Sequence, residues 1–182
     1  MLSLRQAAWN DEEAALTSLL KGDEWSVIAD YGTPIDAQLT TGGQRICFER
    51  FGPGATHICL SGVERRVRLF AFREYYLLER AEAVVAKRGF VLADAWTCVA
   101  TCNELPALQH HFPVPALGTV AHTFDPTTGR RDCPGVLCCR SSAFLPLSRG
   151  KAPVGQITRD AVTLPVQFGF PKEFLVLVMR RS

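Results

Sequence analysis

The sequence of 182 residues lacks the short signatures that identify common catalytic and nucleotide-binding sites. It contains no Gly-x4-Gly-Lys-Ser/Thr phosphate loop, because Gly150 and Lys151 are followed by Ala152. The Gly-x-Gly-x-x-Gly, His-Glu-x-x-His and Gly-x-Ser-x-Gly motifs are also missing. These absences lower the expectation of an enzyme, and we assign no catalytic residue and no cofactor.

Long apolar runs are absent as well. The longest uninterrupted run covers residues 174–179, which is far shorter than the roughly 20 residues that a membrane-spanning helix needs. Residues 1–5 carry one charge and no apolar run, and acidic residues follow at 11–13, so we expect no secretory signal peptide. Asn10 and Asn103 lie outside Asn-x-Ser/Thr glycosylation sites. We therefore expect neither a transmembrane segment nor secretion.

The seven cysteines do not have the pattern of a secreted disulfide framework, since their number is odd and no signal peptide accompanies them. We predict free cysteines in the cytoplasm or another reducing intracellular compartment. A mitochondrial location stays open, because Arg5 lies in a short N-terminal segment without acidic residues. The acidic residues at 11–13 are nevertheless atypical of a mitochondrial presequence.

Neither sign of charge dominates, since 20 basic and 18 acidic residues leave a net charge of +2. The net charge therefore gives no argument for a nucleic-acid or membrane partner. Residues 1–62 hold 4 basic and 8 acidic side chains, whereas residues 63–182 hold 16 and 10. Arginine outnumbers lysine by 16 to 4, which suits buried or bidentate ion pairs at an interface. Genome composition explains that ratio equally well.

The chain shows no internal repeat, low-complexity tract or long linker, so we predict a single α+β domain over residues 1–182. A hydrophobic content of 47% is enough for a core without disulfides or metal. A first helix is expected at about 11–21, where Asn10 and Glu13 form a capping box and Gly22 provides a stop.

Residues 25–62 alternate between polar and apolar side chains, which predicts short antiparallel strands at 25–29, 45–51 and 56–60. The same alternation predicts a strand at 63–71. A second amphipathic helix is expected at about 73–88, ended by Gly89.

The C-terminal half is expected to be rich in β-structure and to end in a hairpin at about 162–179. Alternate apolar residues predict one strand at 162–170, in which Pro165 requires an edge or a bulge. Residues 174–179 would form its partner. The predicted fold class is therefore α+β, an irregular antiparallel sheet with two helices packed on it.

Cysteines at short spacing raise the hypothesis of a zinc site. The sequence has Cys98-x3-Cys102, followed by Cys133 and the pair Cys138 and Cys139. Val99, Thr97 and Trp96 favour a strand at 95–102, which would separate Cys98 and Cys102 by about 13 Å. Two sulfur atoms that bind one zinc at about 2.3 Å cannot be so far apart. The two thiols would converge only if this segment were a helix or a turn. If extended, Cys138 and Cys139 point to opposite sides.

We therefore assign no metal site. The weak candidates Cys98, Cys102, Cys133 and Cys138 are interpreted as small buried hydrophobic residues. A small cysteine- or zinc-dependent enzyme remains the main alternative, with a histidine from positions 110, 111 or 122.

A third hypothesis is an RNA-associated domain. Arg66, Arg68, Phe70 and Phe72 share one face of the strand expected at 63–71 and its continuation, and aromatic rings beside arginines can stack on bases. Glu64 and Glu74 flank this face and the net charge is near zero, so nucleic acid is not the favoured partner.

The favoured hypothesis is a non-catalytic subunit or adaptor that works through protein–protein contacts inside a larger intracellular assembly. The predicted C-terminal hairpin is more apolar than a small sheet readily covers, and exposed apolar patches mark interaction sites. Other protein chains are therefore the expected partners. The candidate partner-binding residues are Val162, Leu164, Val166, Phe168, Phe170, Leu175 and Leu177.

Overall fold

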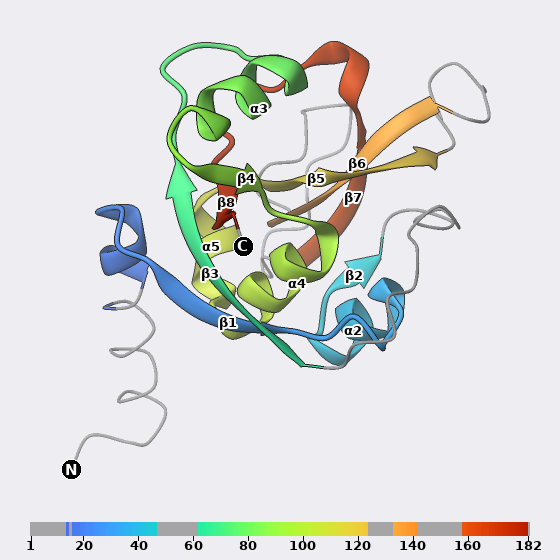
Figure 1. The fold of residues 1–182 in the computed structure, drawn as a ribbon. Coiled ribbons are helices and arrows are strands. Elements are labelled where there is room, and N and C mark those ends of the chain that lie inside the picture. The colour runs from blue at the N-terminus through green and yellow to red at the C-terminus, as the bar shows by residue number, and fades with distance from the viewer. Residues whose placement is uncertain (1–13, 15, 47–61, 124–132, 142–157, 182) are drawn as a thin grey trace.

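The computed structural model describes residues 14, 16–46, 62–123, 133–141 and 158–181. Helices alternate with the strands of two four-stranded sheets, which confirms the predicted α+β class (Figure 1). The named helices are α2 (Ile35–Thr41), α3 (Leu78–Ala86), α4 (Ala95–Glu104) and α5 (Pro106–His111).

The first sheet has the strand order β1-β3-β8-β4, and its neighbouring strands are all antiparallel. Its members are β1 (Trp25–Ala29), β3 (Val63–Phe70), β8 (Val176–Arg180) and β4 (Phe90–Leu92). The strands predicted at 25–29 and 63–71 are confirmed. Alternation identified them because one face of each is buried: on β1, Val27 and Ala29 lie in the core whereas Ile28 is exposed.

The second sheet has the strand order β2-β7-β6-β5. Its members are β2 (Arg45–Ile46), β7 (Arg159–Pro165), β6 (Cys133–Ser141) and β5 (Val114–Thr123). The pair β2–β7 is parallel, which departs from the predicted antiparallel sheet. Arg45 on β2 donates from Nε and Nη2 to the two carboxylate oxygens of the buried Asp160 on β7, at 3.0 and 2.9 Å. The rest of the strand predicted at 45–51, and the strand predicted at 56–60, lie outside the described residues.

The first predicted helix, at 11–21, falls partly outside the described residues, and residues 14 and 16–20 are helical. α2 was not predicted, because residues 25–62 were all interpreted as strands and turns. The helix forms between Pro34, which fixes the backbone before its first turn, and Gly42, whose N–H donates to the Gln38 carbonyl at 2.9 Å.

The second predicted helix begins later than expected, at Leu78 instead of residue 73. Tyr76 forms an isolated antiparallel bridge with Phe170, and this pairing keeps the backbone before Leu78 extended. Ala81 and Val85 are buried on the inner face of α3, which agrees with the predicted amphipathic pattern.

The prediction of a strand at 95–102 is wrong, because these residues belong to helix α4. Asp94 provides the N-cap: its Oδ1 accepts a hydrogen bond from the Thr97 N–H at 2.8 Å. The residues between 95 and 102 include β-branched and aromatic side chains, but their strand propensity is overridden by packing on both sides of the helix.

The predicted hairpin at 162–179 is also wrong. β7 belongs to the second sheet and β8 to the first, so the two strands do not pair. β7 ends at Pro165, which has no N–H to continue the ladder, and a 3-10 turn follows at Val166–Phe168. Gly169, with a φ of 64°, then redirects the chain toward the first sheet.

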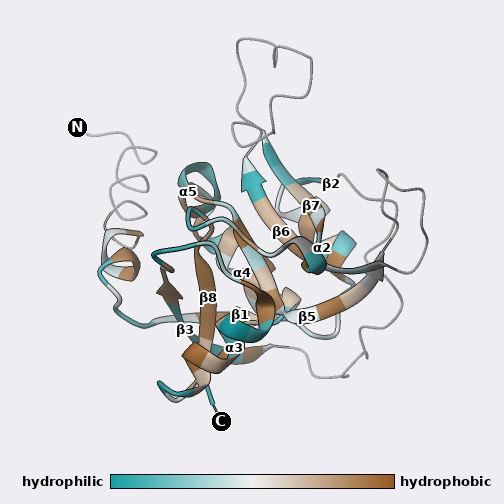
Figure 2. Ribbon diagram, turned by 90° about the horizontal axis from the view of Figure 1, so that it is seen from above, coloured by the Kyte–Doolittle hydropathy of each residue, from teal (hydrophilic) through white to brown (hydrophobic). Residues whose placement is uncertain are grey.

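α4 lies between the two sheets and packs against β1 on one side and against β5 and β6 on the other (Figure 1). The larger hydrophobic core surrounds this helix, and a second core lies beneath α3. Hydrophobic residues run along most of β8, which contributes to both cores (Figure 2). Of the helices in the described part of the chain, none has the length and apolar character needed to cross a membrane.

Candidate functional site

Three cysteines meet in the interior between α4 and β6. The Sγ atoms of Cys98, Cys102 and Cys139 all lie within 4.8 Å of one another, and the three side chains are completely buried. Cys98 and Cys102 are one helical turn apart, so the helix places both thiols on the face that meets β6. We refer to these three residues as the cysteine cluster.

The three thiols differ in pKa, and therefore in how readily each one loses its proton. Hydrogen bonding to Cys102 and Cys139, together with burial, raises the pKa of the Cys98 thiol well above its ordinary value. Hydrogen bonding to Cys139, again with burial, raises the pKa of Cys102. Hydrogen bonds from Cys102 and Cys98 hold the pKa of Cys139 well below its ordinary value. Cys139 is therefore the sulfur atom of the cluster that most readily carries negative charge.

Polar groups from two other segments reach the cysteine cluster. The Gln44 amide N–H and the positive charge of Arg159 both help to lower the pKa of Cys139, and Arg159 also offsets part of the rise in the pKa of Cys102. The Arg159 guanidinium is held in place by the carbonyls of Gly42 and Cys102, to which it donates at 2.7 and 2.5 Å. The cluster thus combines three sulfur atoms, one amide and one fixed cation.

Of the predicted cysteine candidates, Cys98 and Cys102 are brought together and Cys138 is not. Cys138 lies on the opposite face of β6, where Tyr76 is an electrostatic neighbour and burial raises the pKa of the thiol. The side chains of Cys133 and His122 lie outside the described part of the chain. The cysteine cluster includes no histidine or carboxylate from the described residues.

Gln44 and Arg159 were missed by sequence analysis, because their proximity to the cysteines depends on how the two sheets pack. The convergence of Cys98 and Cys102 was missed for a different reason. Asp94 is a residue type that commonly caps the start of a helix, and a helix places residues four apart on one face. That signal was available in the sequence.

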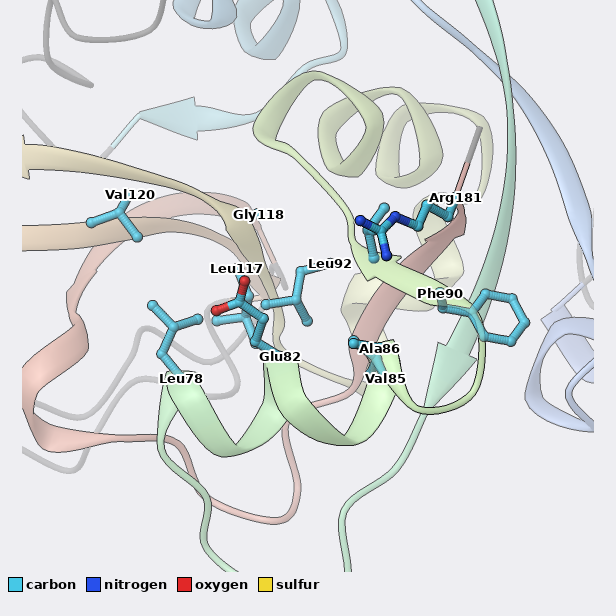
Figure 3. A pocket seen from close by; sticks show the side chains of 11 residues that line it. Leu78, Glu82, Val85, Ala86, Phe90, Leu92, Leu117, Gly118, Val120 and Arg181 are labelled. Carbon is cyan, nitrogen blue, oxygen red and sulfur yellow. The ribbon is translucent and has the colours of Figure 1, made fainter.

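A second feature is an open groove of about 430 Å³ between α3, β4 and β5. Its apolar lining comes from all three elements and includes Leu78 and Val85 on α3, Leu92 on β4, and Leu117 and Val120 on β5. Figure 3 shows the Leu78 and Glu82 side chains rising from α3 toward Leu117. Val120 is 46% exposed, so the apolar lining extends to the surface of the molecule.

The groove carries one charge of each sign. Glu82 lies on α3 and Arg181 follows β8, and Figure 3 places them on opposite sides of Leu92. β4 is an edge strand, paired with β8 on one side only. β5 is tied to the end of β4 beside the groove, because the Gly118 N–H donates to the Ala93 carbonyl at 2.9 Å. A side chain at position 118 would collide with the Leu92 carbonyl.

The predicted partner-binding residues are largely covered within the chain. Val162, Phe170, Leu175 and Leu177 are buried. Leu164 and Val166 are half-buried against the core beneath α3, and the side chain of Phe168 lies outside the described part. An interaction surface therefore has to be sought elsewhere.

The residues of the RNA hypothesis are split between surface and core. Arg66 is exposed on β3, as the predicted strand face requires. Phe70 is buried, and the guanidinium carbons of Arg68 and Arg88 lie 5.9 and 5.2 Å from its ring centre. Phe72 stacks on Tyr76 with ring centres 4.3 Å apart. Both rings already have partners within the chain.

Comparison of the chain with protein families, with curated proteins and with solved structures finds no match. The function is therefore argued from the arrangement of the described residues alone.

Proposed function

We propose that this protein is a non-catalytic interaction module that binds an extended segment of another protein in the groove between α3, β4 and β5. One observation supports this most directly: the apolar lining of the groove includes a side chain that is open to solvent. Val120 lines the groove and is 46% exposed, and Leu77, the residue before the lining residue Leu78, is 48% exposed. Exposed apolar groups that adjoin one another are characteristic of interaction sites.

The shape of the groove favours an extended peptide over a compact ligand. One wall is an edge strand, and the outer side of β4 along Phe90 and Val91 pairs with no other strand in the described chain. Unpaired backbone groups at a sheet edge can bind an added strand, while pockets beside the edge receive alternate side chains. Leu78 and Leu117 line such a pocket.

The two charges give the bound segment a preferred direction. Arg181 attracts an acidic group and Glu82 a basic one, and the two side chains lie on opposite sides of the apolar floor. The partner segment is therefore expected to have apolar residues at alternate positions, with an acidic residue toward one end and a basic residue toward the other.

A peptide selection tests this proposal. Random extended peptides are displayed and selected on the full chain, and the enriched peptides are measured against two variants. Val120→Glu places a charge on the apolar rim, whereas Ile28→Glu places the same charge at a residue that is 59% exposed and does not line the groove. We expect Val120→Glu to weaken binding by at least about tenfold, because burying an unpaired charge is costly, and Ile28→Glu to leave it unchanged.

The proposal is overturned if selection enriches no peptides of this pattern, or if the two variants affect binding equally. The enzyme and RNA hypotheses stay predictions, since no contact among the described residues favours either over a protein partner.

A further inference from the structure

We propose that Cys98, Cys102 and Cys139 form a binding site for a thiophilic divalent cation of the zinc type. The Sγ atoms of the three residues, contributed by α4 and β6, lie within 4.8 Å of one another. A tetrahedral zinc with Zn–S bonds of about 2.3 Å holds its sulfur ligands about 3.8 Å apart. Contraction of the cluster by at most about 1 Å would therefore seat the ion.

The donor set favours zinc over harder cations. All three donors are sulfur, and calcium and magnesium require oxygen ligands. The side chains are fully buried, which corresponds to the closed environment of a structural site. The arrangement also uses positions from two separate elements, so a bound ion would join α4 to β6.

The local charge fits a divalent ion. Three thiolates carry three negative charges, and a divalent cation leaves one of them unbalanced. Arg159 supplies the remaining positive charge, because its guanidinium is fixed beside Cys102 by the Gly42 and Cys102 carbonyls. The site would then be neutral overall, which burial requires.

Gln44 is the candidate for the fourth ligand. Its side chain is 6% exposed, and its Nε2 donates to Asn103 Oδ1 at 3.1 Å, whereas its Oε1 has no hydrogen-bond partner. A buried amide oxygen without a partner is costly in a protein interior. The amide lies beside the Cys139 sulfur, to which its N–H donates, so a rotation that exchanges the amide nitrogen and oxygen would bring Oε1 to the ion and complete the tetrahedron. Binding would form three Zn–S bonds and one Zn–O bond and release the thiol protons to solvent, without any redox change.

Cobalt and zinc titrations of the reduced, metal-free full chain test the site. We expect one Co²⁺ per chain, thiolate-to-cobalt charge-transfer absorption and the visible bands of tetrahedral cobalt, all removed by one equivalent of Zn²⁺. Cys139→Ala should weaken zinc binding by more than about 100-fold, since it removes a direct ligand, and outer-shell changes alone cost 10- to 100-fold.

Cys138→Ala is the matched control. It removes an adjacent, equally buried thiol from the same strand, but from the face that points away from α4. The control should leave the cobalt spectrum unchanged. Gln44→Ala should weaken zinc binding by about tenfold and alter the visible cobalt bands, and it provides a second test should Cys139→Ala fail to fold.

Two results overturn the proposal. One is a folded, reduced wild-type chain that binds no stoichiometric cobalt or zinc, and the other is equal loss of binding in Cys139→Ala and Cys138→Ala. Loss of the peptide-binding groove would not affect this site, so the two proposals fail independently.

Discussion

The cysteine cluster and the groove are both adjacent to β5, but they differ in what encloses them. At the start of β5 the Val114 carbonyl accepts a hydrogen bond from the Cys98 thiol at 3.5 Å, inside the core between the two sheets. Further along the same strand, Val120 lies at the edge of an open groove. Metal binding in the cysteine cluster would depend on side chains that are closed off from water. Peptide binding in the groove would depend on side chains that a partner protein can contact.

This difference determines what a substitution can reveal. In the closed region each polar atom needs a partner within the molecule, so a change there alters folding stability together with any bound ion. In the open groove a change at an exposed position alters binding with little effect on folding. The two regions are linked by residues 118 and 119 of β5, which hydrogen-bond to the segment that begins α4.

The largest effect is expected from Gly118→Ala, which would break the link between the two regions. The added methyl group would collide with backbone atoms of Leu92 and Ala93, and neither can move without displacing β4. We expect the free energy of unfolding to fall by about 3 kcal/mol, measured by chemical denaturation.

Gly89→Ala is the control, because Gly89 has a φ of 79° but open space around it, so only a conformational cost of about 1 kcal/mol applies. Equal losses in the two variants would show that the contact between β5 and β4 is not tightly packed.

A smaller effect is expected from Asp94→Ala, which acts on the closed region alone. The substitution removes the N-cap of α4 and also the carboxylate that accepts a hydrogen bond from the Tyr31 hydroxyl at 2.6 Å. The free energy of unfolding should fall by about 1 to 2 kcal/mol in thermal or chemical denaturation. Asp94→Asn retains an oxygen for the Thr97 N–H and should recover part of the loss. No recovery would indicate that capping does not determine where α4 begins.

The smallest expected effect is a pH dependence of stability that arises from Cys138, on the face of β6 opposite the cysteine cluster. Burial raises the pKa of Cys138, so its thiol stays protonated in the folded chain while the unfolded chain ionises above about pH 8.5. Stability is therefore complete below that pH and declines above it. The contribution of this residue to the free energy of unfolding should fall by about 1 kcal/mol between about pH 8.5 and 9.5.

The comparison for this prediction is Cys138→Val, which has no thiol to ionise, measured with the metal-free protein by denaturation across the same pH range. Parallel declines in the two proteins would contradict the prediction.

The spacing of apolar residues predicted the helices and strands that bury only one face. The strand at Trp25–Ala29 was identified with its bounds, because one face is buried and the other is exposed. The inner face of α3 was identified for the same reason. The hairpin at 162–179 failed because apolar alternation shows that a strand is buried but does not show which sheet buries it.

The candidate sites were less accessible to sequence analysis. The cysteines were recognised as a possible zinc constellation, but the expected strand at 95–102 kept Cys98 and Cys102 apart. The groove was not anticipated, because its lining combines the consecutive elements α3 and β4 with β5, which belongs to the other sheet.

The sequence by itself determined that the chain forms a mixed α+β fold with a buried core, since composition, turn residues and periodicity are local properties. Tertiary structure decided that residues 95–102 form a helix, which Asp94 as a capping residue permits but does not require, and it alone decided that Cys98 and Cys102 meet Cys139. The helix is buried on two sides between the sheets, and the free energy gained by that burial exceeds the weak strand preference of its residues. Distances between residues far apart in the chain follow from packing, which no short stretch of sequence contains.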